Sequence, residues 1–378
     1  MMQISPETQL FIREHSSDDV RVLALQAKKY PDIDMPTAIT QIAGRKVAAE
    51  KIPSWWEIEK IWYPKHLSLE QCSSEITARY KARLLQGDSL TDLTGGFGID
   101  CSFLATGFKS ATYVERQEEL CEIAAHNFPV LNLNHINIKN EDGVTYLQAM
   151  SPVDCLFLDP ARRNEHGGKT VAISDCEPNV AELEELLLQK ANRVMIKLSP
   201  MLDLSLALKE LKQTQEVHIL SVNNECKELL ILLGQTSPTE ISIHCVNLST
   251  KGTQEEQHFV FTREQEQCSE CTYTDSLETY LYEPNASLLK AGAFRSIAAA
   301  YPVRKLHPNS HLYTSDTFIE NFPGRIFRIV NQCSFNKKEV KENLADLKKA
   351  NVTVRNFPAT VAELRKRIHL AEGGDTYL

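Results

Sequence analysis

The 378-residue sequence has no run of about 18 apolar residues, which is the length that a membrane-spanning helix needs. Its first residues, from Met1 to Leu10, also lack the basic and apolar regions of a secretory signal. From these two absences we expect a soluble protein of the cytoplasm.

The sequence also lacks regularly paired cysteines. Its ten cysteines are scattered, and several of them lie inside apolar runs, which predicts buried, reduced thiols and not a disulfide framework. Cys268 and Cys271 form one close pair, but no second pair lies nearby to complete a structural zinc site. We therefore predict no metal centre.

Positive charge is scarce over most of the chain and concentrated in one segment. Residues 285–370 hold 15 Lys and Arg residues against 6 Asp and Glu residues, within a chain whose net charge is −9. This asymmetry favours a module that meets a polyanion such as RNA. The alternative is a solvated, lysine-rich helix at residues 337–349, where Glu339, Glu342 and Asp346 are interspersed among the lysines.

The first 85 residues contain few β-rich runs. Their apolar residues recur at spacings of three and four, which predicts helices at residues 18–30, 35–50 and 69–85. A chain of this length is expected to form two or three domains. We assign residues 1–86 to an N-terminal helical domain.

From Asp88 onward, short apolar runs alternate with helical stretches, which predicts an α/β domain with a parallel sheet. Residues 216–222 and 229–234 are joined too closely for a crossover helix, so we expect these two strands to pair antiparallel. A second hairpin at residues 241–248 and 258–263 would extend the sheet. The five parallel strands are predicted at residues 89–94, 111–115, 136–140, 154–159 and 193–198, within a domain of residues 87–265.

Residues 276–378 are predicted to form a small, basic α+β module. The pattern predicts strands at residues 325–330 and 352–355 and helices at residues 336–349 and 359–368.

A glycine-rich turn follows the first predicted strand, where residues 92–98 read D-L-T-G-G-F-G. Gly95, Gly96 and Gly98 let the backbone approach a cofactor closely, and Asp92 is placed to accept a hydrogen bond from its amino group. The nicotinamide fingerprint requires a third glycine where Cys101 stands. An acid at the turn also suits a sulfonium cation and repels a pyrophosphate. The turn alone would suit any nucleotide cofactor. Together with the antiparallel ending of the sheet and the Asp159-Pro160 pair after the fourth strand, it predicts S-adenosylmethionine.

Two further acids follow the second and third strands. Glu115 stands 17 residues after the glycine-rich turn, where a carboxylate can accept hydrogen bonds from ribose hydroxyls. Asp142 is a candidate for the adenine amino group. A surface glutamate beside Arg116 and a simple turn at Gly143 are the structural alternatives. The remaining predicted cofactor contacts are Thr94, Arg116 and Gly143.

The fourth strand ends in Asp159 and Pro160, at the edge of the sheet where open α/β folds bind ligands. The carboxylate of Asp159 can hold a nitrogen nucleophile, and Pro160 stiffens the following turn. Arg162 and Arg163 can pair with a substrate phosphate, or they neutralise Asp159 and Asp175. We predict Asp159, Pro160 and Arg162 as catalytic residues and Arg163 as a substrate contact.

Lys197 ends the fifth strand, where it lines the site or is a buried lysine that reaches the sheet edge. Gly167 and Gly168 suggest a loop that closes over the substrate. Methylation at carbon 5 of a pyrimidine needs a thiolate, and Cys155 lies in the middle of its strand. Nitrogen or oxygen methylation is therefore favoured over carbon methylation.

These motifs together resemble the class I S-adenosylmethionine-dependent methyltransferases across residues 85–235. Residues 69–75 (LEQCSSE), 282–286 (YEPNA) and 322–325 (FPGR) resemble a subgroup with a C-terminal THUMP-like domain. The resemblance implies a Rossmann-like sheet of seven strands in the order 3-2-1-4-5-7-6, with strand 7 antiparallel. It also implies an RNA substrate by analogy with THUMP domains.

The run Asp-Pro-Ala-Arg departs from the Asn/Asp-Pro-Pro-aromatic motif of amino-methylating enzymes, so the acceptor atom stays open. The leading hypothesis is methyl transfer to tRNA or rRNA, with Arg365 and Lys366 gripping the backbone. Two alternatives remain: a methyltransferase of small molecules or proteins, and an RNA-binding protein with a degenerate cofactor site.

Overall fold

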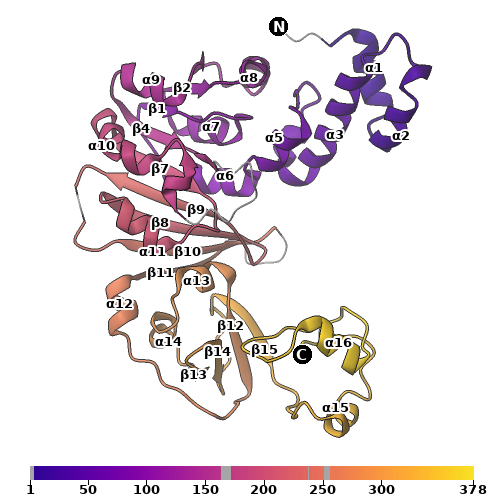
Figure 1. Ribbon diagram of the computed structural model, residues 1–378, viewed down its shortest axis with the longest axis vertical. Helices are drawn as coiled ribbons and strands as arrows, with labels where there is room; N and C mark the ends of the chain where they lie inside the picture. Colours follow the sequence, from indigo (N-terminus) through magenta and orange to yellow (C-terminus); the bar gives the residue numbers. More distant parts are fainter. Residues whose placement is uncertain (1–3, 163–171, 237, 251–255) are drawn as a thin grey trace. The chain divides into compact units, whose positions relative to one another are not determined.

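The structure is a computed structural model that describes residues 4–162, 172–236, 238–250 and 256–378. The chain forms two compact units (Figure 1). Unit 1 comprises Met1–Val222 and Lys227–Ser242, and unit 2 comprises Asn223–Cys226 and Ile243–Leu378. Within the described ranges, no helix combines the length and the hydropathy that crossing a bilayer requires.

Unit 1 begins with helices whose first turns are capped by side chains. Ser5, Asp19 and Asp34 each accept a hydrogen bond from a backbone N–H at the start of a helix, which satisfies one otherwise unpaired donor. The helices are α1 (Pro6–Glu14), α2 (Val20–Leu25), α3 (Met35–Lys51), α4 (Pro53–Trp56), α5 (His66–Gln71) and α6 (Glu75–Ala82).

The single helix predicted at residues 69–85 is two helices. Cys72 and Ser74 have extended backbone angles, with ψ of 160° and 156°, so α5 ends and α6 begins there. Ser73 lies between them and is buried, and its hydroxyl is hydrogen-bonded to the buried side chain of Asp100. The break places the hydroxyl of Ser73 2.7 Å from Oδ2 of Asp100.

A nine-stranded sheet has the order β11-β10-β8-β9-β7-β4-β1-β2-β3. β1 pairs parallel with β2 and β4, β4 pairs parallel with β7, and β7 pairs antiparallel with β9. The order that the resemblance implied therefore holds for seven strands, and the sheet has nine because the second hairpin, predicted at residues 241–248 and 258–263, extends it. Two further strands, β10 and β11, add to the edge at β8. The strands are β1 (Ser89–Asp92), β2 (Ser110–Glu115), β3 (Ile136–Asn140), β4 (Val153–Leu158), β7 (Ala191–Leu198), β8 (Thr214–Val222), β9 (Glu225–Gly234), β10 (Ser242–Leu248) and β11 (Glu256–Thr262).

Helices connect the parallel strands (Figure 1). They are α7 (Ile99–Leu104), α8 (Glu118–Val130), α9 (Gly143–Ala149), α10 (Val180–Lys190) and α11 (Leu204–Glu210), with short 3-10 turns at Ala105–Gly107 and Ile173–Asp175. A further 3-10 turn, Ala27–Lys29, lies between α2 and α3.

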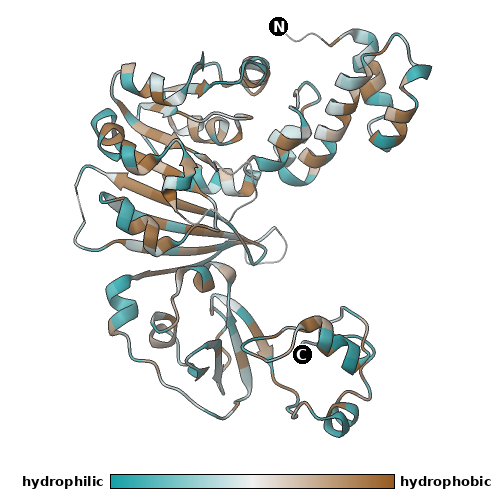
Figure 2. Cartoon of the chain, in the orientation of Figure 1, coloured by the Kyte–Doolittle hydropathy of each residue, from teal (hydrophilic) through white to brown (hydrophobic). Residues whose placement is uncertain are grey.

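The core of unit 1 lies along the central strands. Leu156 on β4, Val194 on β7 and Ile231 on β9 have no exposed surface, and Figure 2 shows these strands as a band of apolar residues. Burial on both faces is typical of central strands in such sheets, and each buried side chain contributes roughly 1.5–3 kcal/mol. This parallel core fixes the carboxyl ends of β1, β2, β4 and β7 at one edge.

Unit 2 contains a four-stranded antiparallel sheet in the order β13-β14-β12-β15. Its strands are β12 (Tyr280–Pro284), β13 (Arg304–His307), β14 (Ser310–Ser315) and β15 (Gly324–Arg328). The helices of this unit are α12 (Arg263–Cys268), α13 (Ala286–Ala291), α14 (Ser296–Ala300), α15 (Lys337–Asn343) and α16 (Val361–Ile368).

The strand predicted at residues 352–355 is absent. The chain instead makes isolated bridges, from Lys349 to Ala371 and from Asn351 to Tyr377, that never extend into a ladder. The helix predicted at residues 336–349 is shorter than expected and ends at Asn343. The small α+β character of this part of the chain is confirmed.

Candidate active site

The turn between β1 and α7 requires its glycines. A Cβ at Gly95 would lie 2.2 Å from the ring of Tyr113, and Gly96 and Gly98 have φ of 55° and 87°. Side chains rarely adopt these left-handed angles. A Cβ at Gly96 would make only an ordinary contact, with the carbonyl oxygen of Thr94 at 3.8 Å, so there is room beside this residue. The turn can therefore admit a ligand against its backbone.

Glu115, at the end of β2, holds this turn in place. Its Oε2 accepts a hydrogen bond from the N–H of Gly96 at 2.9 Å, and its Oε1 accepts one from Gln117 at 2.8 Å. A carboxylate offers about four acceptor positions, so Glu115 retains capacity for ligand hydroxyls.

Asp92, at the end of β1, has an unsatisfied oxygen. The residue is 1% exposed, its Oδ1 accepts from the N–H of Thr94 at 2.9 Å, and its Oδ2 has no partner among the described residues. Burial raises the pKa of Asp92 well above its ordinary value, and the nearby charges of Asp100, Asp159 and Glu115 add to this shift. A buried oxygen in this position needs a donor, and a ligand amino group would provide one.

Thr94 joins the ends of β1 and β4. Its Oγ1 accepts a hydrogen bond from the N–H of Asp159 at 2.6 Å. The side chain of Asp159 is 38% exposed, and its Oδ2 lies 2.5 Å from Nζ of Lys197. Pro160 is buried. The structure therefore brings Asp92, Thr94, Asp159 and Lys197 together at one edge of the sheet.

Asp142 and Gly143 form the start of α9. Oδ1 of Asp142 accepts from the N–H groups of Val144 and Thr145, so this acid caps the helix. A Cβ at Gly143 would lie 2.2 Å from the carbonyl oxygen of Leu93. The glycine therefore lets α9 approach the turn after β1, and the adenine contact of Asp142 stays a prediction.

The predicted arginines differ in what surrounds them. The side chain of Arg116 is 64% exposed and pairs with Glu177 at 3.4 Å. Arg162 lies in β5 (Ala161–Arg162), which pairs antiparallel with β6 (Cys176–Glu177). Arg163 and the glycines Gly167 and Gly168 lie outside the described residues. In unit 2, Arg365 lies 3.2 Å from Glu372, and Lys366 is exposed on α16.

Sequence reasoning missed four buried polar residues beneath Asp159: Ser73, Lys81, Asp100 and Glu228. For Lys81, Asp100 and Glu228, the one sign of burial in the sequence was a charged residue on the apolar face of a helix or strand. Ser73 gave no such sign. Their partners are distant in sequence, so this signal could not show which charges meet.

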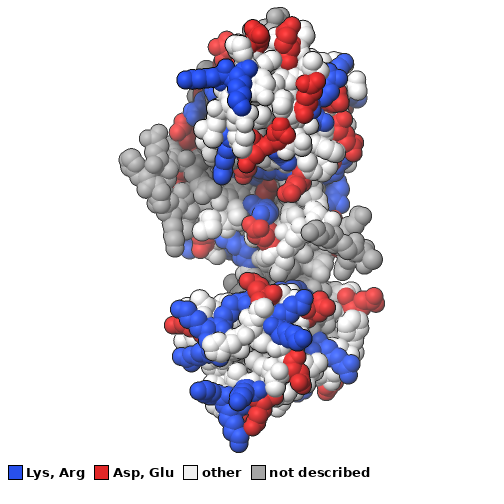
Figure 3. Space-filling model, turned by 90° about the vertical axis from the view of Figure 1, so that its right-hand side faces the viewer, with Lys and Arg blue, Asp and Glu red and all other residues white. Residues whose placement is uncertain are grey.

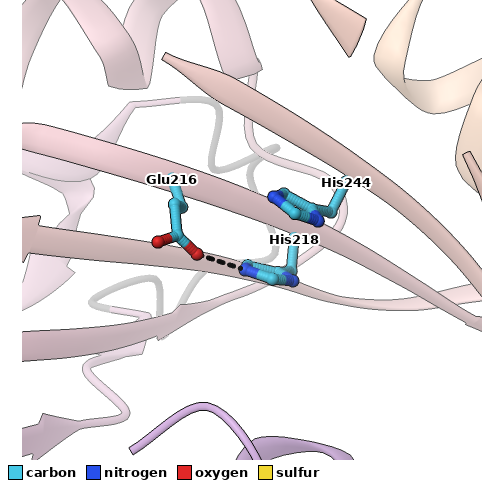
Figure 4. A group of neighbouring side chains, drawn as sticks. All are labelled: Glu216, His218 and His244. Atoms are coloured by element: carbon cyan, nitrogen blue, oxygen red, sulfur yellow. Dashed lines mark hydrogen bonds and ion pairs between the residues drawn. The ribbon is translucent and has the colours of Figure 1, made fainter. Parts of the chain in front are cut away.

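A second buried polar group lies on β8. His218 pairs through Nδ1 with the hydroxyl of Tyr80 at 2.8 Å and through Nε2 with Glu216 at 3.2 Å (Figure 4). A metal ion bound at Nε2 would replace the hydrogen bond between His218 and Glu216. His244, also drawn in Figure 4, belongs to unit 2, where its Nδ1 lies 3.1 Å from Nε2 of His258.

Two family models match parts of unit 2: a ferredoxin-like domain at residues 280–323 and a THUMP domain-like region at residues 324–378. The whole chain is similar to a protein from Porphyromonas gingivalis W83 that is assigned as a methyltransferase. The two are 34% identical, the match covers 100% of this chain and 95% of that chain, and the TM-score is 0.87. The chain therefore belongs to this family of methyltransferases, with a THUMP-like C-terminal domain.

Two other solved structures are similar over a smaller part. An rRNA methylase from Streptococcus thermophilus is 14% identical and covers 42% of this chain and 93% of its own, with a TM-score of 0.31. A protein from Streptococcus mutans, assigned as a methyltransferase and in complex with SAH, is 13% identical, covers 42% and 96%, and has the same TM-score of 0.31. Similarities this weak carry no assignment. A comparison with curated proteins found no match.

Proposed function

We propose that this protein transfers a methyl group from S-adenosylmethionine to a nitrogen of an RNA base, in tRNA or rRNA. The observation that carries the proposal is the Oδ2 of buried Asp92, which has no hydrogen-bond partner among the described residues, at the start of a turn where Gly96 leaves room for a ligand. The bound cofactor would supply an electrophilic methyl group.

The residues at the edge of β1 and β2 fit this cofactor. Asp92 would accept from its amino group, which satisfies the buried oxygen. Glu115 would accept from the ribose hydroxyls, and the glycine turn would pass the methionine portion. Thr94, Arg116, Asp142 and Gly143 would complete the surroundings of the cofactor.

Asp159 would act on the methyl acceptor. Its partly exposed carboxylate can accept a hydrogen bond from an N–H and so orient the nitrogen lone pair. It can then take the proton that the nitrogen loses. Because the sulfonium is already reactive, alignment supplies much of the rate enhancement. Pro160 and Arg162 would shape the path of the substrate beside it.

Unit 2 would bind the phosphate backbone of the RNA. Residues 324–378 hold 11 Lys and Arg residues and 6 Asp and Glu residues. Figure 3 shows Lys and Arg side chains gathered on its lower part. Backbone phosphates attract such a surface without regard to sequence. Arg365 and Lys366 on α16 are the contacts that we propose there.

Comparison of RNA nucleosides by mass spectrometry, between cells with and without the protein, tests the proposal. We expect one methylated nucleoside to be missing without the protein. Wild-type protein and the control Asp88→Asn, which changes an exposed carboxylate, should restore it, whereas Asp159→Ala should not.

Two other outcomes would contradict the proposal. Unchanged RNA together with tight binding of S-adenosylhomocysteine would indicate a small-molecule or protein substrate. Unchanged RNA without such binding would indicate an RNA-binding protein with a degenerate site.

A further inference from the structure

Lys197 is a buried ammonium that contacts three oxygens. Its Nζ lies 2.5 Å from Oδ2 of Asp159, 3.2 Å from Oδ2 of Asp100 and 3.0 Å from the hydroxyl of Ser73. An ammonium has three N–H donors, so these contacts use its full capacity. The position of Lys197, and of the Asp159 oxygen that it contacts, is therefore set by Ser73 and Asp100.

A second buried ammonium lies behind the first. Nζ of Lys81, a fully buried residue, lies 2.8 Å from the hydroxyl of Ser73, 2.9 Å from Oδ1 of Asp100 and 2.6 Å from Oε2 of Glu228. The hydroxyl of Ser73 accepts from both lysines and donates to Asp100 at 2.7 Å. Ser73 is thus the junction between the two ammonium groups.

The helical segment before the sheet supplies this junction. Ser73 lies between α5 and α6, and Lys81 lies on α6. The same segment packs on the glycine-rich turn, because the ring of Phe97 lies 5.2 Å from that of Trp55 and 6.3 Å from that of Tyr63. The segment before the sheet therefore makes both polar and apolar contacts with the sheet edge where Asp92 and Asp159 lie.

We propose that Lys197 is a positioning residue, which holds Asp159 as an ionised acceptor, and that Ser73 and Lys81 fix Lys197 in this role. The proposal rests on the proposed methyl transfer. A buried ion network is weak evidence of a stabilising role, because desolvation of its charges offsets much of their attraction. The ion pairs and hydrogen bonds that join both lysines to Asp100 and Ser73 still fix one geometry, which methyl transfer requires.

The charges that face Asp159 come from four elements. Lys197 on β7 and Lys81 on α6 are cationic, and Asp100 on α7 and Asp92 on β1 are acidic. The pKa of Asp159 is raised overall, because its carboxyl lies among buried groups although part of the side chain is exposed, and Lys197 is the strongest influence in the opposite direction. Burial lowers the pKa of Lys197, but Asp100, Asp159 and Glu228 outweigh it and raise that pKa well above its ordinary value. The ammonium therefore stays charged beside Asp159.

The test compares Lys197→Met, Lys197→Arg and Ser73→Ala with the control Lys209→Met, which removes an exposed lysine of α11. The assay measures transfer of label from S-adenosylmethionine to RNA from cells that lack the protein, between about pH 5 and about pH 9. Calorimetry with S-adenosylhomocysteine reports on the cofactor site separately.

We expect Lys197→Met to bind S-adenosylhomocysteine within about twofold of wild type and to lower kcat by more than about tenfold. The acidic limb of its kcat–pH profile should move to higher pH by about one unit, because Asp159 holds a proton more tightly without the neighbouring ammonium. Lys197→Arg should keep the limb of wild type at a reduced rate. Ser73→Ala should shift it less than Lys197→Met, and Lys209→Met should match wild type.

A kcat–pH profile of Lys197→Met that equals that of wild type would overturn the inference. If Lys197→Met fails to fold, an unshifted limb in Ser73→Ala, seen together with a lower melting temperature, would also overturn it. Failure of the proposed function is distinct, because wild type itself would then transfer no label to RNA at any pH.

Discussion

At the scale of single residues, the ends of β1 and β4 hold carboxylates in unlike environments. Asp92 is buried and has an oxygen without a partner in the described part of the chain, whereas Asp159 is partly exposed and contacts an ammonium. Burial raises the pKa of both acids, but only Asp159 has a neighbouring ammonium that opposes the shift and favours the charged form. The two acids are therefore suited to different roles, one toward the cofactor and one toward the acceptor.

The raised pKa of Asp92 predicts how ligand binding depends on pH. An ionised carboxylate accepts a hydrogen bond from the cofactor's cationic amino group more strongly than a protonated one does. Affinity for S-adenosylhomocysteine should therefore rise as pH rises through this pKa. Asp92→Asn should bind more weakly and lose this dependence. Isothermal titration calorimetry at several pH values measures both effects, with Asp88→Asn as the exposed control.

The same substitution should stabilise the ligand-free protein. Because the pKa of Asp92 is raised in the folded state, the stability that this group contributes is present at low pH and declines as pH rises. We expect Asp92→Asn to increase the free energy of unfolding by about 1 kcal/mol at neutral pH. An unchanged or lower value in urea denaturation would show that the carboxylate is not strained by its burial.

Gly96 permits a test with a matched control. Valine at Gly96 or at Gly292 would place a side chain at a left-handed φ, of 55° and 78°, and no atom would lie closer than 3.8 Å to the added Cβ. Both variants should lose about 1–2 kcal/mol of stability. Only Gly96→Val should lose binding of S-adenosylhomocysteine, as measured by calorimetry. Equal affinity in both variants would exclude the turn as the cofactor site.

At the scale of elements, local pattern predicted most strands and helices of the sheet. Asp159 falls directly after β4, and Glu115 ends β2, as the spacing of apolar runs indicated. Residues 69–85 have helical periodicity throughout, so the only local sign of the break is the run Ser73-Ser74-Glu75, which is typical of a helix start and begins α6. The contacts of the Ser73 hydroxyl with Asp100 and Lys197 join residues far apart in the sequence and could not be predicted. The contact of Lys197 with Asp159 was missed for the same reason. Lys197 lies on β7 and Asp159 follows β4, and the pairing register that brings them together cannot be deduced from the sequence of either strand alone.

Two aromatic side chains of the THUMP-like region provide a prediction at this scale. Phe335 and Phe357 are 37% and 44% exposed, and their rings pack edge to face 5.9 Å apart. The guanidinium of Arg367 lies 5.6 Å from the Phe335 ring. Stacking of an RNA base on such a ring contributes about 1–3 kcal/mol.

We expect the double variant Phe335→Ala and Phe357→Ala to weaken RNA binding by about tenfold or more, without changing how binding depends on salt. Electrophoretic mobility shifts at several salt concentrations measure this. Phe318→Ala, at an exposed phenylalanine outside the region, is the control. A changed salt dependence with equal affinity would argue against stacking.

At the scale of the whole molecule, charge is divided unevenly along the chain. Residues 285–370 carry a balance of +9, and the rest of the sequence carries −18. If RNA contacts the basic segment, replacing Arg365, Lys366 and Arg367 by Glu should weaken RNA binding. The slope of the logarithm of the binding constant against the logarithm of the salt concentration should also become shallower, by about one unit per lost phosphate contact. Reversing three lysines of unit 1 that are exposed, Lys28, Lys29 and Lys209, changes the net charge by the same amount. Fluorescence anisotropy with RNA from cells lacking the protein separates the two cases. An equal loss in both variants would mean that net charge alone attracts the RNA, and unchanged binding in both would remove RNA as the partner of this segment.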